Sequence, residues 1–218
     1  LYLGAEHAAE VLEYEWHSSH KIFRKFQLLG LPGSNGHPGL QSLTFVPTPA
    51  SSEEGYFYAS TGTSGAIYIY EVPLLSEGTL ESASSVSEWK PNPRKTASHH
   101  ARGLAYADGY LFVCFALEDS TLLRIFHVLA SGRPGSLREE HHVDVLEVAD
   151  LAVRKAEEET WHIFFISKEK PKVYGYSFRF FEGFQLHPYC APVEVHTVDS
   201  NAMRSTWLLA VFLSVMAI

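Results

Sequence analysis

The sequence predicts an all-β protein, a β-propeller of about four blades. One pattern carries this prediction: an apolar strand, a small polar turn, and a second strand with an aromatic residue at its fourth position. The pattern is clearest at residues 58–72 (YASTGTSGAIYIYEV) and recurs at residues 2–16, 114–128 and 165–178. Such repetition of strands and turns, with no helical stretch between them, is typical of propeller blades.

Equivalent positions of the four repeats carry residues of one kind. The distance from Val11 to Ile67 is 56 positions, from Ile67 to Leu123 it is again 56, and from Leu123 to Val173 it is 50. Alternation within these strands is imperfect, as expected for a strand that is buried between two neighbouring sheets. An aromatic column follows at Tyr14, Tyr70, Phe126 and Tyr176.

Three segments are expected to be inner strands of blades: residues 39–45 (GLQSLTF), 100–106 (HARGLAY) and 148–153 (VADLAV), each with a leucine at the same point. The first repeat lacks such a segment, because the chain opens directly on LYLG. Two arrangements remain open. The chain is a fragment of a six-bladed ring whose preceding part is missing, or it is a closed four-bladed ring in which residues 193–198 fill the empty inner position.

The remaining elements follow from turn residues and composition. Residues 21–31 are expected to form the outer strand of the first blade, and PGSNGHPG at residues 32–39 turns the chain. Residues 47–55 are expected to be a polar loop. Residues 74–95 indicate a weak outer strand and a long serine-rich loop. SGRPGS (131–136) precedes the outer strand of the third blade, and AEEET (156–160) is a hairpin tip in the fourth.

Length and charge fit a single β domain over residues 1–198. The chain has 218 residues, 46% of them hydrophobic and 13% aromatic, enough to bury a core. Its formal charge of −8 disfavours nucleic acid as a partner, since phosphate binding needs a concentrated basic patch. Cys114 is expected in a buried strand and Cys190 in a loop, and two cysteines do not define a redox compartment.

Residues 199–218 change character and form an apolar tail. The uninterrupted apolar run over residues 207–218 is too short for a bilayer-spanning helix of about 20 residues. Small residues precede it, as in a glycosylphosphatidylinositol attachment signal, although the spacer is shorter than the usual 8 to 12 or so. This interpretation implies membrane attachment and a secreted or cell-surface location; a misjoined gene model and an apolar strand completing the propeller are the alternatives.

Short motifs resemble a known family. GLQSLTFVP followed by GYFYAS, and above all HIFFISKEKPKVYGYS, are similar to the SdiA-regulated propeller domain and to its relative, the phytase-type esterase-like domain. The resemblance covers residues 36–178, and the motifs are also compatible with six-bladed propellers of the NHL or gluconolactonase-like kind. Where that family often carries glutamate in the inner strand, this chain has Gln41, Arg102 and Ala149, with Asp150 one place later.

Candidate site residues are expected at the mouth of the central channel, where inner strands and hairpin turns converge. The inner strands offer Gln41 and the candidate catalytic residues His100, Arg102 and Asp150. The turns offer Glu6, Glu118, Asp119 and Glu169 as channel or ligand-binding residues. Carboxylates around one axis suit calcium, for which Glu6, Glu118 and Asp150 are the candidate ligands. A ring that mixes these residue types is more typical of a neutralised polar channel.

Two functions are compatible with the sequence. GxSxG, HExxH and a phosphate-binding loop are absent from the sequence, which favours a binding module for a protein or glycan ligand. The alternative is a calcium-dependent esterase or phosphatase-like hydrolase, implied by the family resemblance and by the carboxylates at the expected channel mouth.

Overall fold

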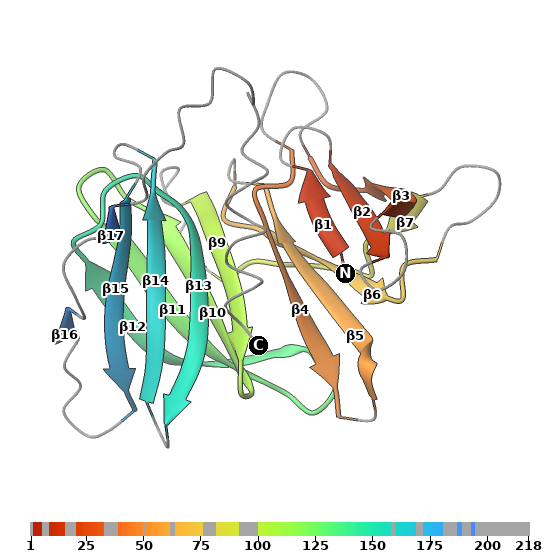
Figure 1. Cartoon of the computed structure of the whole chain (residues 1–218). Helices are drawn as coiled ribbons and strands as arrows, with labels where there is room; N and C mark the ends of the chain where they lie inside the picture. The colour runs from red at the N-terminus through yellow and green to blue at the C-terminus, as the bar shows by residue number, and fades with distance from the viewer. Residues whose placement is uncertain are drawn as a thin grey trace.

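The computed structural model describes residues 2–5, 9–15, 21–32, 39–49, 51–61, 64–75, 82–91, 100–157, 160–168, 172–180, 187–188 and 193–194. These residues form an all-β structure of four sheets, without a helix (Figure 1). The all-β class predicted from the sequence is therefore confirmed.

Each sheet is described by its strands in spatial order. The first sheet contains β1 (Tyr2–Ala5), β2 (Glu10–Glu15), β3 (Lys21–Leu29) and β7 (Ser82–Ser84). The second contains β4 (Ser42–Thr48), β5 (Ser51–Ser60), β6 (Ile67–Val72) and β8 (Ser87–Trp89). The third contains β9 (His100–Ala107), β10 (Tyr110–Ala116), β11 (Thr121–Val128) and β12 (Pro134–Val143). The fourth contains β13 (Val148–Glu157), β14 (Thr160–Ser167), β15 (Lys172–Arg179), β16 (His187–Pro188) and β17 (Val193–Glu194).

A tight turn connects the first two strands of the third sheet. Between β9 and β10 the two turn residues are Asp108 and Gly109, with φ angles of 48° and 82°. Positive φ at both residues is the geometry of an Asp-Gly hairpin turn, whose twist matches that of the strands. The prediction of a polar loop at residues 47–55 was wrong, because β4 runs to Thr48 and pairs there with Ser51 of β5. Its polar residues belong to the end of a hairpin.

The serine-rich segment between β6 and the third sheet links two sheets. β7 pairs in parallel with β3 of the first sheet, whereas β8 pairs antiparallel with β6 of the second. The sequence predicted one weak outer strand here, and the structure divides the segment into two strands of different sheets. The short chain segment between β7 and β8 therefore links the first sheet to the second.

β16 and β17 complete the outer side of the fourth sheet. β16 pairs with Tyr176 and Ser177 of β15, and β17 pairs with Lys172 and Val173 of the same strand. Val193 and Glu194 therefore do not fill the inner position of the first sheet, as one sequence-based alternative required. They continue the fourth sheet beyond β15.

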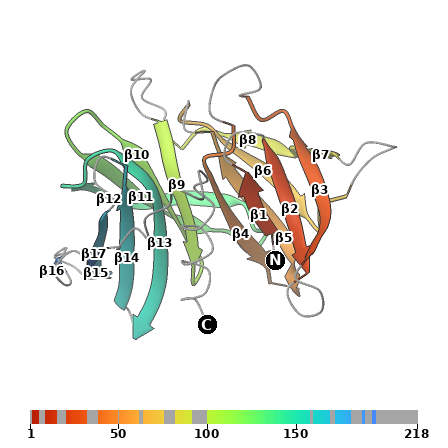
Figure 2. The same ribbon diagram turned by 45° about the horizontal axis from the view of Figure 1, so that its top comes forward.

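Figure 2 shows the sheets following one another. Among the described residues, an apolar core lies between each two consecutive sheets. One joins the first and second sheets around Phe26 and Tyr70. Another joins the second and third around Tyr58 and Phe115. The last joins the third and fourth around Phe112 and Phe165. A strand with an apolar core on each face carries apolar residues at successive positions, which explains the imperfect alternation in the sequence. In β6, for example, Ile67 and Tyr68 point to opposite faces and both are buried.

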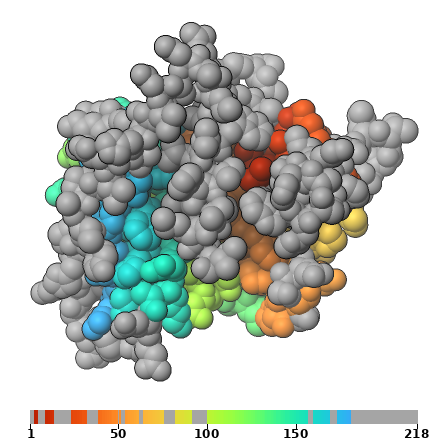
Figure 3. All heavy atoms as spheres, viewed as in Figure 1, coloured from red at the N-terminus to blue at the C-terminus, as the bar shows by residue number. Residues whose placement is uncertain are grey.

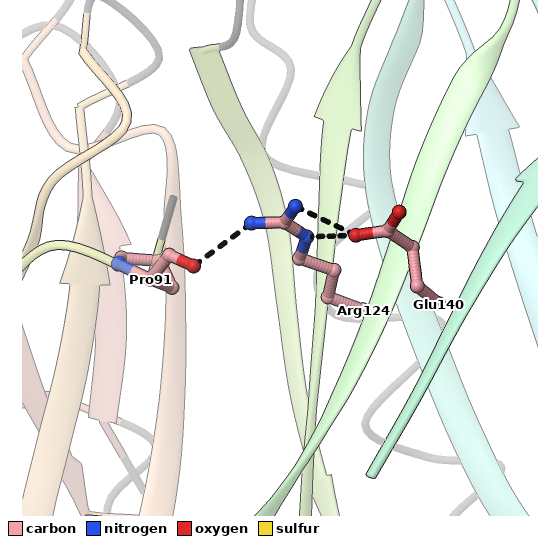
Figure 4. Close-up of polar contacts among 3 residues, drawn as sticks. All are labelled: Pro91, Arg124 and Glu140. Atoms are coloured by element: carbon pink, nitrogen blue, oxygen red, sulfur yellow. Dashed lines mark hydrogen bonds and ion pairs between the residues drawn. The ribbon is translucent and has the colours of Figure 1, made fainter. Parts of the chain in front are cut away.

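Polar contacts fix the second sheet to the third away from the inner strands. Arg124 of β11 is 9% exposed and donates from Nη1 to the carbonyl oxygen of Pro91 at 2.9 Å (Figure 4). Its Nε and Nη2 contact Oε2 of Glu140 at 2.7 and 2.6 Å. On the same interface the Tyr58 hydroxyl donates to the Gly132 carbonyl at 2.6 Å. Burial raises the pKa of Tyr58 well above its ordinary value, so this hydroxyl stays a donor.

The first strands of the second, third and fourth sheets lie side by side. β9 packs between β4 and β13, and Figures 1 and 2 show the three strands together. We call β4, β9 and β13 the inner strands. All three segments expected as inner strands are strands at one edge of their sheets, although the first begins at Ser42 rather than at residue 39. In Figure 3, atoms of β13 and β14 and atoms of β4 and β5 are visible on opposite sides of the same face.

Candidate functional site

The inner strands meet at a polar cluster centred on Ser42. Its hydroxyl donates to Oδ1 of Asp150 at 2.8 Å and accepts from the Leu104 backbone N–H at 3.0 Å. These three groups come from β4, β13 and β9. Asp150 Oδ1 also accepts from the backbone N–H of Leu151 at 2.8 Å. Ser42 is only 4% exposed, so its hydroxyl is satisfied within the protein.

A second set of contacts lies one or two residues before the first along each of the three segments. Gln41 donates from Nε2 to the Ala149 carbonyl at 3.0 Å. Its Oε1 accepts from Nη1 of Arg102 at 3.4 Å. We call Gln41, Ser42, Arg102 and Asp150 the inner-strand cluster. Three of its four members are residues that the sequence placed at the channel mouth, and the structure brings them together.

Two irregularities in pairing occur at equivalent places. In β9, Gly103 pairs with Cys114 and Ala101 with Phe115, so Arg102 is an extra residue. In β13, Asp150 pairs with Ile166 and Val148 with Ser167, so Ala149 is an extra residue. Bulges of this kind change the direction of side chains and are frequent beside functional sites. They explain how strands with little polar surface present Arg102 and Asp150 at their junction.

The strands approach so closely that the position of Gly103 admits no side chain. A Cβ atom there would lie 2.6 Å from the Leu151 nitrogen and 2.8 Å from Sγ of Cys114. Hydroxyl groups of β4 satisfy the outward N–H groups of β9, because Thr44 Oγ1 accepts from Tyr106 at 3.1 Å as Ser42 does from Leu104. The edge of β9 is thus capped by side chains of a neighbouring sheet.

Two nitrogen atoms of the candidate catalytic residues have no hydrogen-bond partner in the described part of the chain. Nε of Arg102 and Nδ1 of His100 are closed to solvent and form no hydrogen bond with the described residues. Arg102 also forms no ion pair within that part of the chain. A buried donor without an acceptor costs about 1–3 kcal/mol. Such groups in a folded protein call for an explanation.

Cys114 lies under the cluster and is chemically quiet. The side chain is fully buried and is not part of a disulfide. Burial raises the pKa of its thiol well above the ordinary value, and the Asp150 carboxylate raises it further, while Arg102 lowers it. The thiolate, which is the reactive form, is therefore disfavoured. Cys114 acts as a core residue, as its place in an apolar strand predicted.

The predicted turn carboxylates form no hydrogen bond to the cluster among the described residues, or lie outside those residues. Glu118 and Asp119 are exposed in the turn between β10 and β11, where Asp119 accepts from the Ser120 hydroxyl at 3.1 Å. Glu6 and Glu169 lie outside the described residues. Within the described part of the chain, no three His, Cys, Asp or Glu side chains form a group suited to a metal ion.

Ser42 is the member of the cluster that sequence reasoning missed. A serine in an apolar strand has no distinctive pattern of its own. The repeat register contained the signal, because Ser42, Gly103 and Asp150 each precede the aligned leucine of an inner strand. At this aligned position two inner strands carry a small residue and the third carries a carboxylate. Such a combination indicates that the backbones of the inner strands approach closely around one polar group.

Comparisons with known proteins give no family for this chain. No protein-family model matches it, and no curated protein sequence matches it significantly. In the part of the chain that the structure describes, no helix has the length and apolar character needed to cross a membrane.

Proposed function

We propose that the chain is a β-propeller that serves as a secreted or cell-surface binding module for a protein or glycan ligand. In this proposal the four sheets are blades, the inner strands surround the axis, and the ligand binds at the inner-strand cluster. One observation carries it: the inner strands and the residue before β4 bring Gln41, Arg102 and Asp150 to one place.

The arrangement of the sheets supports the propeller. Consecutive sheets share apolar cores, and the first strand of each of the last three sheets packs at a common junction. Ser42 contacts Asp150 directly, although the second and fourth sheets are separated in the chain by the third. A side-chain hydrogen bond between alternate blades requires a narrow centre, which favours a ring of four blades over a six-bladed ring with an open channel, although Val193 and Glu194 do not supply an inner strand to the first blade.

The bonding within the cluster favours binding over hydrolysis. A serine nucleophile needs a general base that takes its proton, commonly a histidine. The Ser42 hydroxyl instead donates to Asp150 and accepts from a backbone N–H, so it fixes the strands. The calcium-dependent hydrolase implied by the resemblance to SdiA-regulated and phytase-type domains remains the alternative, with Glu6, Glu118 and Asp150 as calcium ligands.

The binding proposal is tested with a defined panel of extracellular glycans and purified extracellular proteins presented to the full chain. Wild type is compared with Arg102→Gln and Gln41→Ala, and with Arg154→Gln as a matched control from the exposed part of β13. We expect at least one ligand whose binding is lost in the first two variants and kept in the control. Ligands that bind all four proteins equally would place binding elsewhere and contradict the proposal.

A further inference from the structure

Among the described strands, the first sheet has no counterpart of the inner strands. β4, β9 and β13 each pair with the next strand of their own sheet, and β1 is the repeat equivalent of that next strand. β1 pairs only with β2 in the described part of the chain, so its other edge is open. Its four residues, YLGA, carry no charge. An uncharged open edge is suited to pairing with a further strand.

The open edge belongs beside β4. A Cβ atom on Gly4 would lie 2.4 Å from Cδ2 of Leu40 and 3.8 Å from Cβ of Leu43, so β1 approaches the beginning of β4 (Figure 2). In the same way β5 contacts β9, and β10 contacts β13. In those two cases the inner strand that precedes also packs against the next one, β4 against β9 and β9 against β13. A strand paired with β1 is therefore expected to pack against β4.

A segment with the inner-strand pattern occurs in the apolar tail. The inner strands share a leucine, a small or β-branched residue and a third apolar residue, in the triplets LTF of β4, LAY of β9 and LAV of β13. Residues 209–211 repeat the triplet LAV within the run WLLAVF at residues 207–212. A continuous apolar run of this length suits a strand buried on both faces. Residues 195–218 lie outside the described residues.

The last described strand directs the chain to the required end of the sheets. Glu194 of β17 pairs with Lys172, Lys172 with Ser167, and Ser167 with Val148, the first residue of β13. β17 is antiparallel to β15, so the chain leaves the fourth sheet at the end where β13 begins. Three strand spacings, about 15 Å in all, separate β17 from β13. Residues 195–206 span up to about 40 Å when extended, which leaves about 25 Å to cross the junction.

We propose that residues 207–212 form the fourth inner strand, antiparallel to β1, and complete the first blade. In the β4–β5 pair, Leu43 lies opposite Ala59. Leu3 is the repeat equivalent of Ala59, so Leu209 should lie opposite Leu3. The inference rests on the four-bladed arrangement proposed above and not on the binding of a ligand. It assigns the tail to the propeller rather than to a membrane-attachment signal.

The first test is a disulfide bond between positions 3 and 209 of the full chain, in a Cys190→Ser background. Opposite residues of an antiparallel pair have Cα atoms about 4.5–5.5 Å apart, within the range of a disulfide. We expect mild oxidation to cross-link Leu3→Cys/Leu209→Cys, as shown by peptide mapping. Leu3→Cys/Leu213→Cys is the matched control, since its second cysteine would lie about 13 Å further along the strand. It should cross-link roughly tenfold less.

A second test needs no cysteine and measures the melting temperature of single variants. Leu209→Asp would place a carboxylate between the inner strands, so we expect its melting temperature to fall by about 5 °C or more relative to wild type. Ala217→Asp makes the same charge change beyond the proposed strand. It should leave the melting temperature within about 2 °C of wild type.

Three outcomes would overturn this inference. Equal cross-linking of the two double-cysteine variants would show that the tail is not held in this register. A cross-link formed only between two chains would assign the open edge of β1 to a second copy. Equal melting temperatures of Leu209→Asp and Ala217→Asp would show that residues 207–212 are not buried in the fold. No ligand takes part in these measurements, so the ligand panel decides the binding proposal separately.

Discussion

Ser42 donates a 2.8 Å hydrogen bond to Asp150 although 108 positions of sequence separate them. The same hydroxyl accepts from Leu104, so one oxygen atom joins the three inner strands. Replacement of Ser42 by alanine would leave the buried Leu104 N–H without this acceptor and would remove one of the donors to Oδ1 of Asp150. The geometry of this junction therefore depends on a side chain with a single polar atom.

We predict that Ser42→Ala lowers the free energy of unfolding by about 1–3 kcal/mol, the cost of an unsatisfied buried group. Urea denaturation measures this change, and Ser136→Ala, an exposed serine in β12, is the control. Asp150→Asn should cost less, because its side-chain oxygen still accepts the Ser42 hydrogen bond. Equal and negligible changes for Ser42→Ala and Ser136→Ala would show that the bond does not stabilise the fold.

Gly103→Ala should be among the most destabilising single substitutions in β9. The added Cβ would meet the Leu151 nitrogen at 2.6 Å and the Asp150 carbonyl carbon at 2.9 Å, both backbone atoms that cannot rotate away. Overpacking of this kind costs typically about 1–3 kcal/mol, and more when backbone must shift. Gly109→Ala is the comparison, since nothing lies within 4 Å and only its φ of 82° opposes alanine. Thermal denaturation should rank Gly103→Ala as the less stable protein.

The repeat register predicted the inner strands and three members of the cluster, because leucine columns recur wherever the same packing recurs. It did not predict β16, and it did not place β7 or β17 in their sheets, because strands of two or three residues are too short for periodicity. A strand at residues 193–198 was expected in the first blade, whereas Val193 and Glu194 pair with β15. The pairing partners of these short strands lie in β3 and β15, and only the tertiary structure brings these strands together. The Ser42 hydrogen bonds were missed for the same reason, since both partners are distant in sequence.

Arg124→Met should destabilise the interface between the second and third sheets more than Glu140→Gln does. Methionine retains the apolar stem but leaves the buried Pro91 carbonyl without its donor, at a cost of about 1–3 kcal/mol. The side chain of Glu140 is 41% exposed, so Glu140→Gln should lower the free energy of unfolding only slightly. Chemical denaturation of both variants checks the order. A larger loss in Glu140→Gln would mean that the ion pair, rather than the carbonyl contact, stabilises the interface.

Stability should fall in mild acid partly because of His141. Burial lowers the pKa of His141 below its ordinary 6.5, although Glu139 and Glu140 raise it. The unfolded chain therefore binds a proton at a higher pH than the folded one. The stabilising contribution is complete above about pH 6.5 and is lost as the pH falls from there toward the folded pKa. Urea midpoints at pH 7.5 and about 5.5 should differ less in His141→Gln than in wild type. His142→Gln, at an exposed neighbour, should keep the wild-type difference.

Calcium should leave the melting temperature of the full chain unchanged. Oδ1 of Asp150 already accepts from Ser42 and Leu151, and Glu118 is exposed in the turn between β10 and β11. A bound ion at a hundredfold excess over its Kd would instead add about 2.7 kcal/mol of stability. Melts in calcium chloride and in a chelator, for wild type, Glu118→Gln and Asp150→Asn, separate the two cases. A calcium-dependent rise that either substitution abolishes would favour the hydrolase over the binding module, because a hydrogen-bonded junction of inner strands does not require an ion.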